Sequence, residues 1–188
     1  MAKVNRFGKA TVLTSEQLQQ LWYELDQPHR LITQIAYFTA ARIGEVLQLR
    51  REDVGADTIV YRATNTKTKT TREVEIPSQL RSLLDAAELP AKGYLFPSAG
   101  KSGHLTRQGV DQGTKQAAAL VGIEGVSTHS FRRSMATHLH LAGVPLRAIQ
   151  RITGHATLAA LEQYLDIERR EASQQHQKVL DGLFPVEA

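Results

Sequence analysis

The chain has 188 residues, of which 41% are hydrophobic, a length and composition that suit one domain with a single core. It has no cysteine, which excludes disulfide bonds, thiolate metal sites and a cysteine nucleophile. The net charge of +4, from 23 Lys and Arg against 19 Asp and Glu, is compatible with nucleic-acid binding and equally with a solvated surface. No stretch approaches a membrane span and no signal-peptide core begins the chain, so we expect a cytoplasmic protein without a membrane partner.

The first quarter of the chain has the apolar periodicity of helices. Thr14 has the hydroxyl and the spacing of a capping box for a helix over residues 15–25. A second helix is predicted over residues 29–40, and a helical pattern resumes at residues 43–49. Arg42 is therefore predicted to lie at a helix junction.

Two short β-prone runs, residues 58–61 and 74–76, flank the polar stretch 65–72. This pattern predicts a hairpin with a flexible, basic tip, whose second strand ends at Pro77. The elements predicted next are a helix at 78–88, a brief strand at 94–96 and a loop at 98–103.

The second half of the chain is predicted to be almost wholly helical. Gly143 and Gly154 suit left-handed helix ends, Pro145 suits a first helical turn and Thr157 suits an N-cap. The expected fold is therefore mixed α+β and predominantly helical, with a small antiparallel β-sheet at one edge. The helices are expected at residues 106–121, 130–142, 145–153 and 157–170.

Two arginines, two histidines and a tyrosine together suggest covalent chemistry on a phosphodiester. A guanidinium can grip a phosphate through paired N–H donors, an imidazole can donate a further hydrogen bond, and a tyrosine can attack the phosphorus. In chain order these residues are Arg42, His129, Arg132, His155 and Tyr164.

Taken singly, these residues also have structural interpretations. Arg42 can form an ion pair with Glu45 three residues on, and Tyr164, at helical spacing with leucines, suits a core position with a hydrated hydroxyl. His138 and His140 lie two residues apart on a predicted helix, where side chains do not face each other. We therefore predict no metal site.

Four motifs in order give the chain a family resemblance that covers nearly its whole length. They are TAARIGEVLQLR at 39–50, KTTREVEIP at 69–77, THSFRRSMATHLHLAG at 128–143 and VPLRAIQRITGHATLAALEQYL at 144–165. With them, the chain resembles the tyrosine recombinases, also called phage-type integrases. The resemblance implies the catalytic fold of that family and a function in cutting and rejoining DNA, in the cytoplasm at the nucleoid.

The resemblance implies a role for each residue of the phosphodiester set. Arg42 and Arg132 become the arginines that clamp the phosphate, His129 the histidine paired with the second arginine, and His155 a further donor. Tyr164 becomes the nucleophile that forms a 3′-phosphotyrosyl bond, which a 5′-hydroxyl of a partner strand then reverses. The family mechanism requires no cofactor.

The family also uses a hairpin lysine, which protonates the leaving 5′-oxygen. Lys69 fits this role best, and Lys67 is its rival. Arg133 stands where the family often has a second histidine. The further residues expected to contact DNA, unless they are simply solvated surface, are Lys67, Arg72, Thr106, Arg107, Gln108 and Arg133.

The expected organisation is one catalytic domain over residues 1–188, with an arm or linker remnant at 1–13 and no N-terminal clamp domain. The tail at 171–188 is expected to pack either on its own protomer or on a neighbour. We expect double-stranded DNA as the partner, a monomer in solution, a homotetramer on paired sites, and accessory DNA-bending proteins. Without a clamp, DNA binding should be weaker and more salt-sensitive than in two-domain relatives.

Two other functions stay open at this point. Residues 144–165 also have the pattern of a helix-turn-helix, as in a transcription regulator without catalysis. DNA relaxation of the type IB topoisomerase kind would use the same chemistry without a partner strand. The sequence leaves the target site open, and with it the choice among integration, excision, inversion and dimer resolution.

Overall fold

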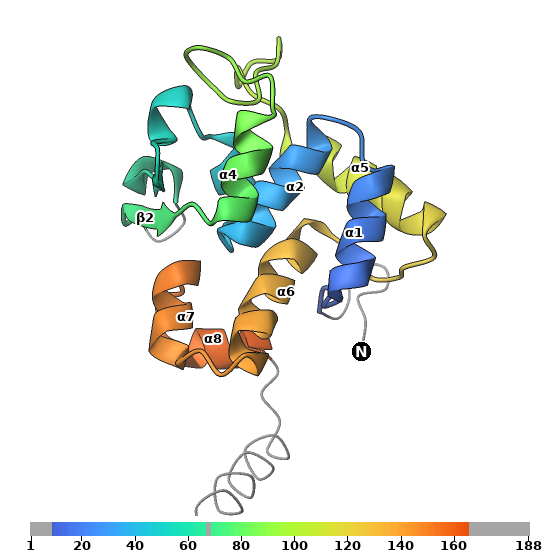
Figure 1. Cartoon of the computed structure of the whole chain (residues 1–188), viewed down its shortest axis with the longest axis vertical. Helices are drawn as coiled ribbons and strands as arrows, with labels where there is room; N and C mark the ends of the chain where they lie inside the picture. The colour runs from blue at the N-terminus through green and yellow to red at the C-terminus, as the bar shows by residue number, and fades with distance from the viewer. Residues whose placement is uncertain (1–8, 67–68, 166–188) are drawn as a thin grey trace, which may run out of the picture.

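The structure, a computed structural model, describes residues 9–66 and 69–165. Most of the predicted arm, Lys67 and the predicted tail lie outside these residues. Within them, helices dominate and a two-stranded antiparallel sheet lies at one side, as predicted (Figure 1). The helices are α1 (Ser15–Glu24), α2 (His29–Phe38), α3 (Ile43–Leu47), α4 (Ser78–Asp85), α5 (Arg107–Leu120), α6 (Thr128–Leu141), α7 (Leu146–Thr153) and α8 (Leu158–Leu165). Short 3-10 turns are η1 (Arg51–Asp53) and η2 (Ala63–Asn65), and the strands are β1 (Thr58–Tyr61) and β2 (Arg72–Glu75).

Local signals set the start of α1 as predicted. The Thr14 Oγ1 accepts the backbone N–H of Gln17 at 3.2 Å, and the Gln17 Oε1 accepts the backbone N–H of Thr14 at 3.1 Å. This reciprocal capping satisfies N–H groups that the first turn leaves without helical partners. Leu18 and Leu21 then turn the apolar face of α1 into the core.

The chain breaks helical geometry between α2 and α3, where the junction was predicted. Ala40 has φ +48°, and Arg42 adopts an extended backbone with φ −75° and ψ 142°. Arg42 is thereby the N-cap of α3, and its side chain leaves the backbone where the chain changes direction.

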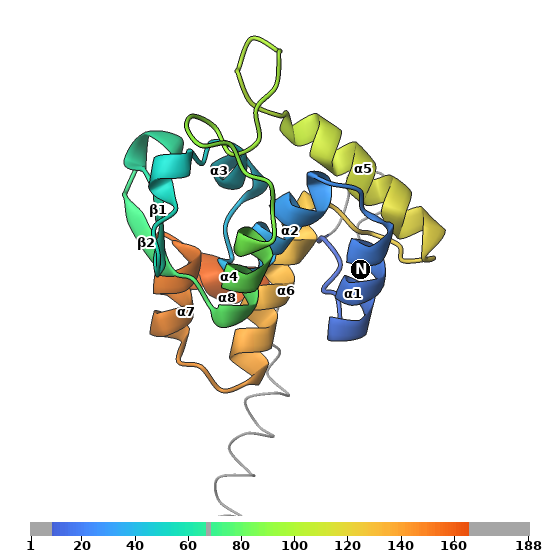
Figure 2. The same ribbon diagram turned by 45° about the horizontal axis from the view of Figure 1, so that its top comes forward.

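The hairpin forms with β2 two residues ahead of its predicted start. In the register, Ile59 lies opposite Val74 and Tyr61 lies opposite Arg72, so the ladder extends to the polar end of the hairpin (Figure 2). The predicted strand at 94–96 is wrong. Tyr94 makes only an isolated bridge to Arg50, since the flanking chain does not run alongside a partner for longer.

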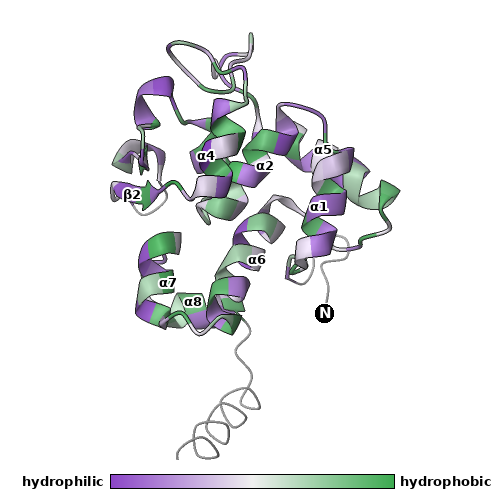
Figure 3. Cartoon of the chain, viewed as in Figure 1, coloured by the Kyte–Doolittle hydropathy of each residue, from purple (hydrophilic) through white to green (hydrophobic). Residues whose placement is uncertain are grey.

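Apolar side chains collect in two clusters. The larger cluster is formed by helices α1 through α5, the sheet and the start of α6. Its members include Leu21, Ile35 and Phe131. The smaller cluster joins the second half of α6 to α7 and α8, through Ala136 and Ile149 among others. Figure 3 shows the apolar faces turned inward, and Figure 1 shows α7 and α8 against α6, apart from α1, α2 and α4.

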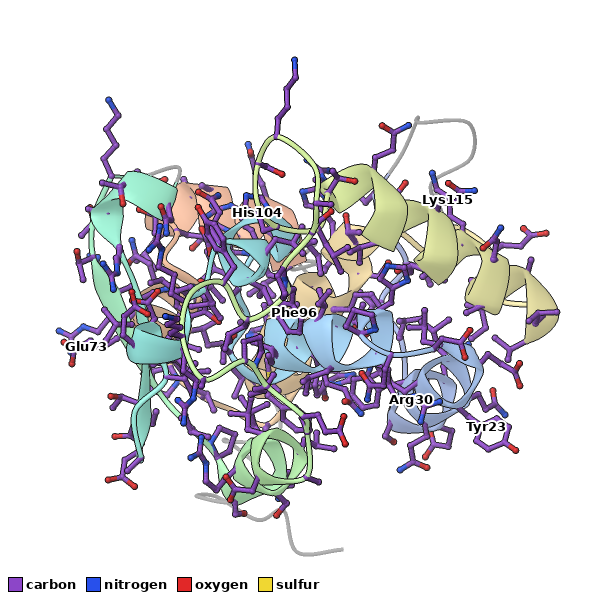
Figure 4. All side chains as sticks on the ribbon, turned by 90° about the horizontal axis from the view of Figure 1, so that it is seen from above. Tyr23, Arg30, Glu73, Phe96, His104 and Lys115 are labelled. Atoms are coloured by element: carbon purple, nitrogen blue, oxygen red, sulfur yellow. The ribbon has the colours of Figure 1, made fainter. Side chains whose placement is uncertain are left out.

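The side chains sort between solvent and interior as the periodicity requires. Figure 4 shows Tyr23 and Glu73 pointing outward, whereas Phe96 lies in the interior and is 2% exposed. Gly143 and Gly154 have φ of +79° and +68°, the left-handed conformation predicted for the ends of α6 and α7. In the described part of the chain, no helix combines the length and the apolar character needed to cross a membrane.

Candidate active site

Two clefts meet at the start of α3 and contain most of the predicted site. The hairpin cleft, of about 580 Å³, lies between Thr66, Thr70, Thr71 and Arg72 on one side and the turn from α7 to α8 on the other. The α5 cleft, of about 200 Å³, lies between α3 and the first turns of α5 and α6. Arg42 and Glu45 line both clefts, so the two spaces share one wall.

Arg42 and Glu45 form the shared wall through a close ion pair. The Arg42 Nη1 donates to Glu45 Oε1 at 2.7 Å, and the Arg42 backbone N–H donates to Oε2 at 3.1 Å. Glu45 is 4% exposed, whereas the Arg42 side chain is 27% exposed. The structural and functional interpretations of Arg42 are therefore compatible, because the pair holds the guanidinium in place while part of it faces both clefts.

Arg132 is buried at the base of the site and is 2% exposed. Its Nη1 donates to the carbonyl oxygen of Ala40 at 2.8 Å, next to the junction that carries Arg42. Its Nη2 lies 3.3 Å from the Nε2 of His155. Burial, and then the nearby charge of Arg42, lower the pKa of Arg132 to about 10, so its guanidinium is charged at neutral pH.

His155 follows the left-handed Gly154 and lines the hairpin cleft. Its Nδ1 lies 2.7 Å from the Oγ1 of Thr153. Burial, followed by the positive charge of Arg132, lowers the pKa of His155 to about 3. The ring is therefore neutral at neutral pH.

Tyr164, on α8, lies beside both His155 and Arg132. The ring centres of Tyr164 and His155 are 4.9 Å apart, and the Arg132 guanidinium carbon lies 6.0 Å from the centre of the Tyr164 ring. The hydroxyl donates to the carbonyl oxygen of His129 at 3.4 Å. Burial raises the pKa of Tyr164, so the phenol holds its proton more tightly than in water.

His129 lies at the exposed first turn of α6, between the α5 cleft and a hollow of about 420 Å³ beside Tyr164. Its Nδ1 is 3.4 Å from the Nη2 of Arg107, the first residue of α5. His129 and Arg132 thus point to the same cleft, as their spacing of three residues predicts. Thr106 and Gln108 are exposed beside Arg107, and the Thr106 hydroxyl caps α5.

Lys69 lies on the hairpin loop beside the hairpin cleft. It is exposed, has φ +51°, and its backbone N–H donates to the Thr66 carbonyl oxygen at 3.2 Å. Its neighbours Thr70 and Thr71 line the cleft, whereas Lys69 itself is outside the lining. The loop therefore brings Lys69 next to the cleft without fixing its ammonium group there. Its rival Lys67 lies outside the described residues.

Two residues predicted to contact DNA donate hydrogen bonds to backbone carbonyl groups of the protein itself. Arg133 is 7% exposed and donates to the carbonyl oxygens of Ala10 and Tyr164, at 2.6 and 3.2 Å. Arg72 donates to the carbonyl oxygen of Ile152 and pairs with Glu45. Both guanidiniums are turned toward backbone carbonyl groups, because burying their charge requires hydrogen-bond partners.

The charge of the two clefts suits an anion. Among the described residues in their linings, Glu45 is the single carboxylate, and it is already engaged by Arg42 and Arg72. Sequence reasoning missed this bridging role and also missed Thr153 as a partner of His155. The lining arginines are Arg42, Arg107, Arg132 and Arg151, together with Arg72, whose guanidinium is already engaged by Ile152 and Glu45. Guanidiniums gathered in a partly desolvated cleft bind phosphate oxygens in preference to neutral groups.

Comparisons with known proteins agree with the motifs. Residues 11–171 match the model of the phage integrase family. The tyrosine recombinase XerD of Bradyrhizobium diazoefficiens is 31% identical over 150 residues, which cover 72% of this chain and 47% of that protein. The chain spans about half the length of these curated relatives.

Solved structures show the same fold. The catalytic domain of bacteriophage HP1 integrase is 24% identical, with a TM-score of 0.65, and the match covers 95% of this chain and 100% of that domain. The XerH site-specific recombinase bound to its difH substrate is 23% identical, with a TM-score of 0.66 and coverage of 88% and 53%. With the family model matched over most of its length, the chain belongs to the phage integrase family.

Proposed function

We propose that this chain is the catalytic domain of a site-specific recombinase, which cuts and rejoins double-stranded DNA through a 3′-phosphotyrosyl bond at Tyr164. One observation carries the proposal: the Tyr164 ring lies 4.9 Å from that of His155 and 6.0 Å from the guanidinium of Arg132. A tyrosine therefore adjoins the phosphate-binding donors. The XerD relative and the XerH structure bound to its difH substrate support recombination and DNA as the partner.

The proposed step begins with a phosphodiester bound by Arg42 and Arg132. In-line attack creates a transition state with extra negative charge on the non-bridging oxygens, and fixed donors stabilise that charge more than they stabilise the ground state. The ion pair with Glu45 and the bond to Ala40 hold the two guanidiniums in place before DNA arrives. Such preorganisation avoids reorienting the donors during the reaction.

Proton transfers accompany the exchange of bonds. The Tyr164 oxygen bonds to phosphorus, its proton passes to His129, and the bond from phosphorus to the 5′-oxygen breaks. Lys69 donates a proton to that oxygen, which leaves as a hydroxyl. A general acid of this kind typically contributes about 10² to 10⁴ in rate.

Rejoining reverses these steps. A 5′-hydroxyl of the partner strand attacks the phosphotyrosyl group and releases Tyr164, so the bond energy is kept and no nucleotide cofactor is consumed. We expect a monomer in solution and a homotetramer on paired sites, where strands from two duplexes exchange. Thr106, Arg107 and Gln108, exposed at the start of α5, are the proposed contacts to the flanking duplex.

Covalent trapping tests the proposal. The protein is incubated with a pooled library of nicked duplexes, in which a short strand diffuses away after cleavage and prevents religation. Denaturing gels then show protein attached to DNA, and sequencing of the trapped strands identifies the site. We expect an adduct with the wild type and none with Tyr164→Phe.

Tyr23→Phe is the matched control, because Tyr23 is 79% exposed on α1 and has the same chemistry as Tyr164 without the surrounding donors. Its adduct should equal that of the wild type. An adduct that survives Tyr164→Phe would contradict the assignment of the nucleophile. DNA binding without an adduct from any variant would favour the helix-turn-helix function, and plasmid relaxation without recombinants would favour a topoisomerase.

A further inference from the structure

Arg72 reaches from the hairpin across the hairpin cleft to α7. It opens β2 opposite Tyr61, and its side chain is 11% exposed. Its Nη1 donates to the carbonyl oxygen of Ile152 on α7, while its Nη2 pairs with Glu45 Oε2 at 3.2 Å. Its guanidinium carbon lies 4.8 Å from the centre of the Tyr61 ring, so the guanidinium makes a cation–π contact with that ring.

The elements that Arg72 joins belong to different packing units. Helices α7 and α8 pack mainly on each other and on α6, through the smaller apolar cluster. We call these two helices and the turn between them the α7–α8 unit. It carries His155 and Tyr164, whereas Arg42, Glu45 and the hairpin belong to the larger cluster and its surface. Chemistry at one phosphate requires the two sets of side chains to keep a fixed separation.

We propose that Arg72 is a positioning residue that holds the α7–α8 unit, and with it His155 and Tyr164, at a fixed distance from Arg42. The inference rests on the proposed function for its catalytic consequence. The rigid, planar guanidinium bridges two acceptors on opposite sides of the cleft, which the flexible point charge of a lysine does not do equally well. Glu45 completes the connection, because its other oxygen binds Arg42.

Gly154 gives Arg72 the space for this connection. A Cβ at Gly154 would lie 3.3 Å from the Cδ of Arg72, so the arginine stem packs directly on the turn that precedes His155. Arg72 thus contacts Gly154 and donates to the carbonyl oxygen of Ile152, the two residues that flank Thr153. The Thr153 hydroxyl in turn contacts His155. We therefore expect a displacement of the Arg72 side chain to displace the His155 ring, because His155 directly follows Gly154.

Arg62 offers a matched control on the same hairpin. It pairs with the buried carboxylate of Asp53 at 2.5 Å, as Arg72 pairs with that of Glu45, and Asp53 is 3% exposed. Arg62 stays on its own side of the cleft, since its described acidic partners, Asp53 and Glu52, both lie in η1. Arg62→Met removes an arginine from a buried carboxylate without touching α7.

The test compares the wild type, Arg72→Met, Arg72→Lys and Arg62→Met in the full chain. Amide hydrogen exchange is measured on the free proteins, with α2 as the internal reference for global stability. The single-turnover rate of adduct formation is measured at saturating nicked DNA, and the DNA affinity is titrated against salt. If Arg72→Met does not fold, Arg72→Lys carries the comparison.

We expect Arg72→Met to speed exchange in α7 and α8 relative to α2, and to slow adduct formation about 10- to 100-fold at unchanged DNA affinity. Arg72→Lys should fall between Arg72→Met and the wild type, and Arg62→Met should match the wild type in α7 and α8. Unchanged exchange in α7 and α8 overturns the proposal. So does weaker DNA binding with a salt slope reduced by about 1 at an unchanged rate, which would make Arg72 a phosphate contact.

The exchange measurement separates this inference from the proposed function. A wild-type protein that forms no adduct contradicts the recombinase proposal. The exchange of α7 and α8 in Arg72→Met still decides whether Arg72 holds the α7–α8 unit.

Discussion

The Thr153 Oγ1 lies 2.7 Å from the Nδ1 of His155, and the other partners of both groups favour a ring proton on Nδ1. The threonine hydroxyl donates its own proton to the Ile149 carbonyl oxygen at 2.8 Å, so toward His155 it accepts. On the other side of the ring, the Arg132 Nη2 can only donate, and Nε2 accepts at 3.3 Å. This arrangement favours one neutral tautomer of His155, and Nε2 could donate to a phosphate only after a change of tautomer or after protonation of the ring.

The acid stability of the protein should report this neutral histidine. The pKa of His155 is lowered by burial and by Arg132 from 6.5 to about 3, so the unfolded chain takes up a proton first as the pH falls. The free energy of unfolding should therefore decrease from about pH 6.5 toward pH 3. His155→Gln, which does not titrate, should show a shallower decrease in urea unfolding measured from about pH 4 to pH 7. Parallel pH curves for the two proteins would rule out a buried neutral histidine.

Arg133 and Arg107 should respond in opposite ways to replacement by methionine. Arg133→Met leaves the Ala10 and Tyr164 carbonyl oxygens without this donor, and we expect a loss of about 1 to 3 kcal/mol in the free energy of unfolding with unchanged DNA affinity. Arg107→Met, at an exposed position, should leave stability nearly unchanged. It should weaken DNA binding and reduce the salt slope by about 1.

Chemical denaturation and salt-titrated binding on both variants check this pair of predictions. A drop in DNA affinity for a fully folded Arg133→Met would support the sequence-based assignment of Arg133 as a DNA contact. Normal affinity for Arg107→Met would remove the start of α5 from the DNA interface.

The fold was largely predictable because its signals are local. The capping box at Thr14, the left-handed glycines and the apolar spacing each act within a few residues, and each was found where the sequence placed it. The strand predicted at 94–96 failed for a non-local reason, since a strand exists only where a partner runs beside it. The start of β2 was missed because pairing with Tyr61 extends the ladder into a polar segment.

The side-chain directions of the arginines were not predictable in the same way. Arg72 and Arg133 are basic residues on polar segments, which the sequence does not distinguish from residues facing DNA. Their acceptors include the carbonyl oxygens of Ile152 and Ala10, 80 and 123 residues away. A carbonyl group is present at every position, so no residue type signals such a partner. The resemblance indicated which residues gather, and only the structure places their partners.

Alanine substitutions at Gly154 and Gly143 distinguish the effect of backbone strain from the effect of contact with Arg72. Both have positive φ, of +68° and +79°, so an alanine at either position should cost about 1 to 2 kcal/mol in the free energy of unfolding. Only at Gly154 does a Cβ meet a neighbour within 4 Å, the Arg72 side chain. We expect Gly154→Ala to slow adduct formation strongly and Gly143→Ala to leave the rate of the folded protein unchanged.

Urea unfolding and single-turnover trapping on the two alanine variants measure both effects. Equal rates with equal losses of stability would mean that the close approach of Arg72 to Gly154 has no catalytic consequence.

Thr153→Val should release the His155 tautomer while keeping the shape of the side chain. Thr153 is fully buried and valine is close to it in volume, so the loss comes from the hydroxyl, which accepts from His155 and donates to Ile149. The Nδ1–H of His155 then lacks its acceptor, so only the contact of Arg132 with Nε2 still favours this tautomer. We expect nitrogen NMR of the labelled ring to show the Nδ1–H tautomer in the wild type and a mixture in Thr153→Val. Adduct formation should slow about tenfold, the lower end of what the loss of a hydrogen-bond partner of a site histidine typically costs.

Thr137→Val is the control, because its buried hydroxyl on α6 has no hydrogen-bond partner among the described residues. An unchanged ring spectrum in Thr153→Val would show that Arg132 alone sets the tautomer, and that the Thr153 hydroxyl serves only its bond to Ile149 within α7.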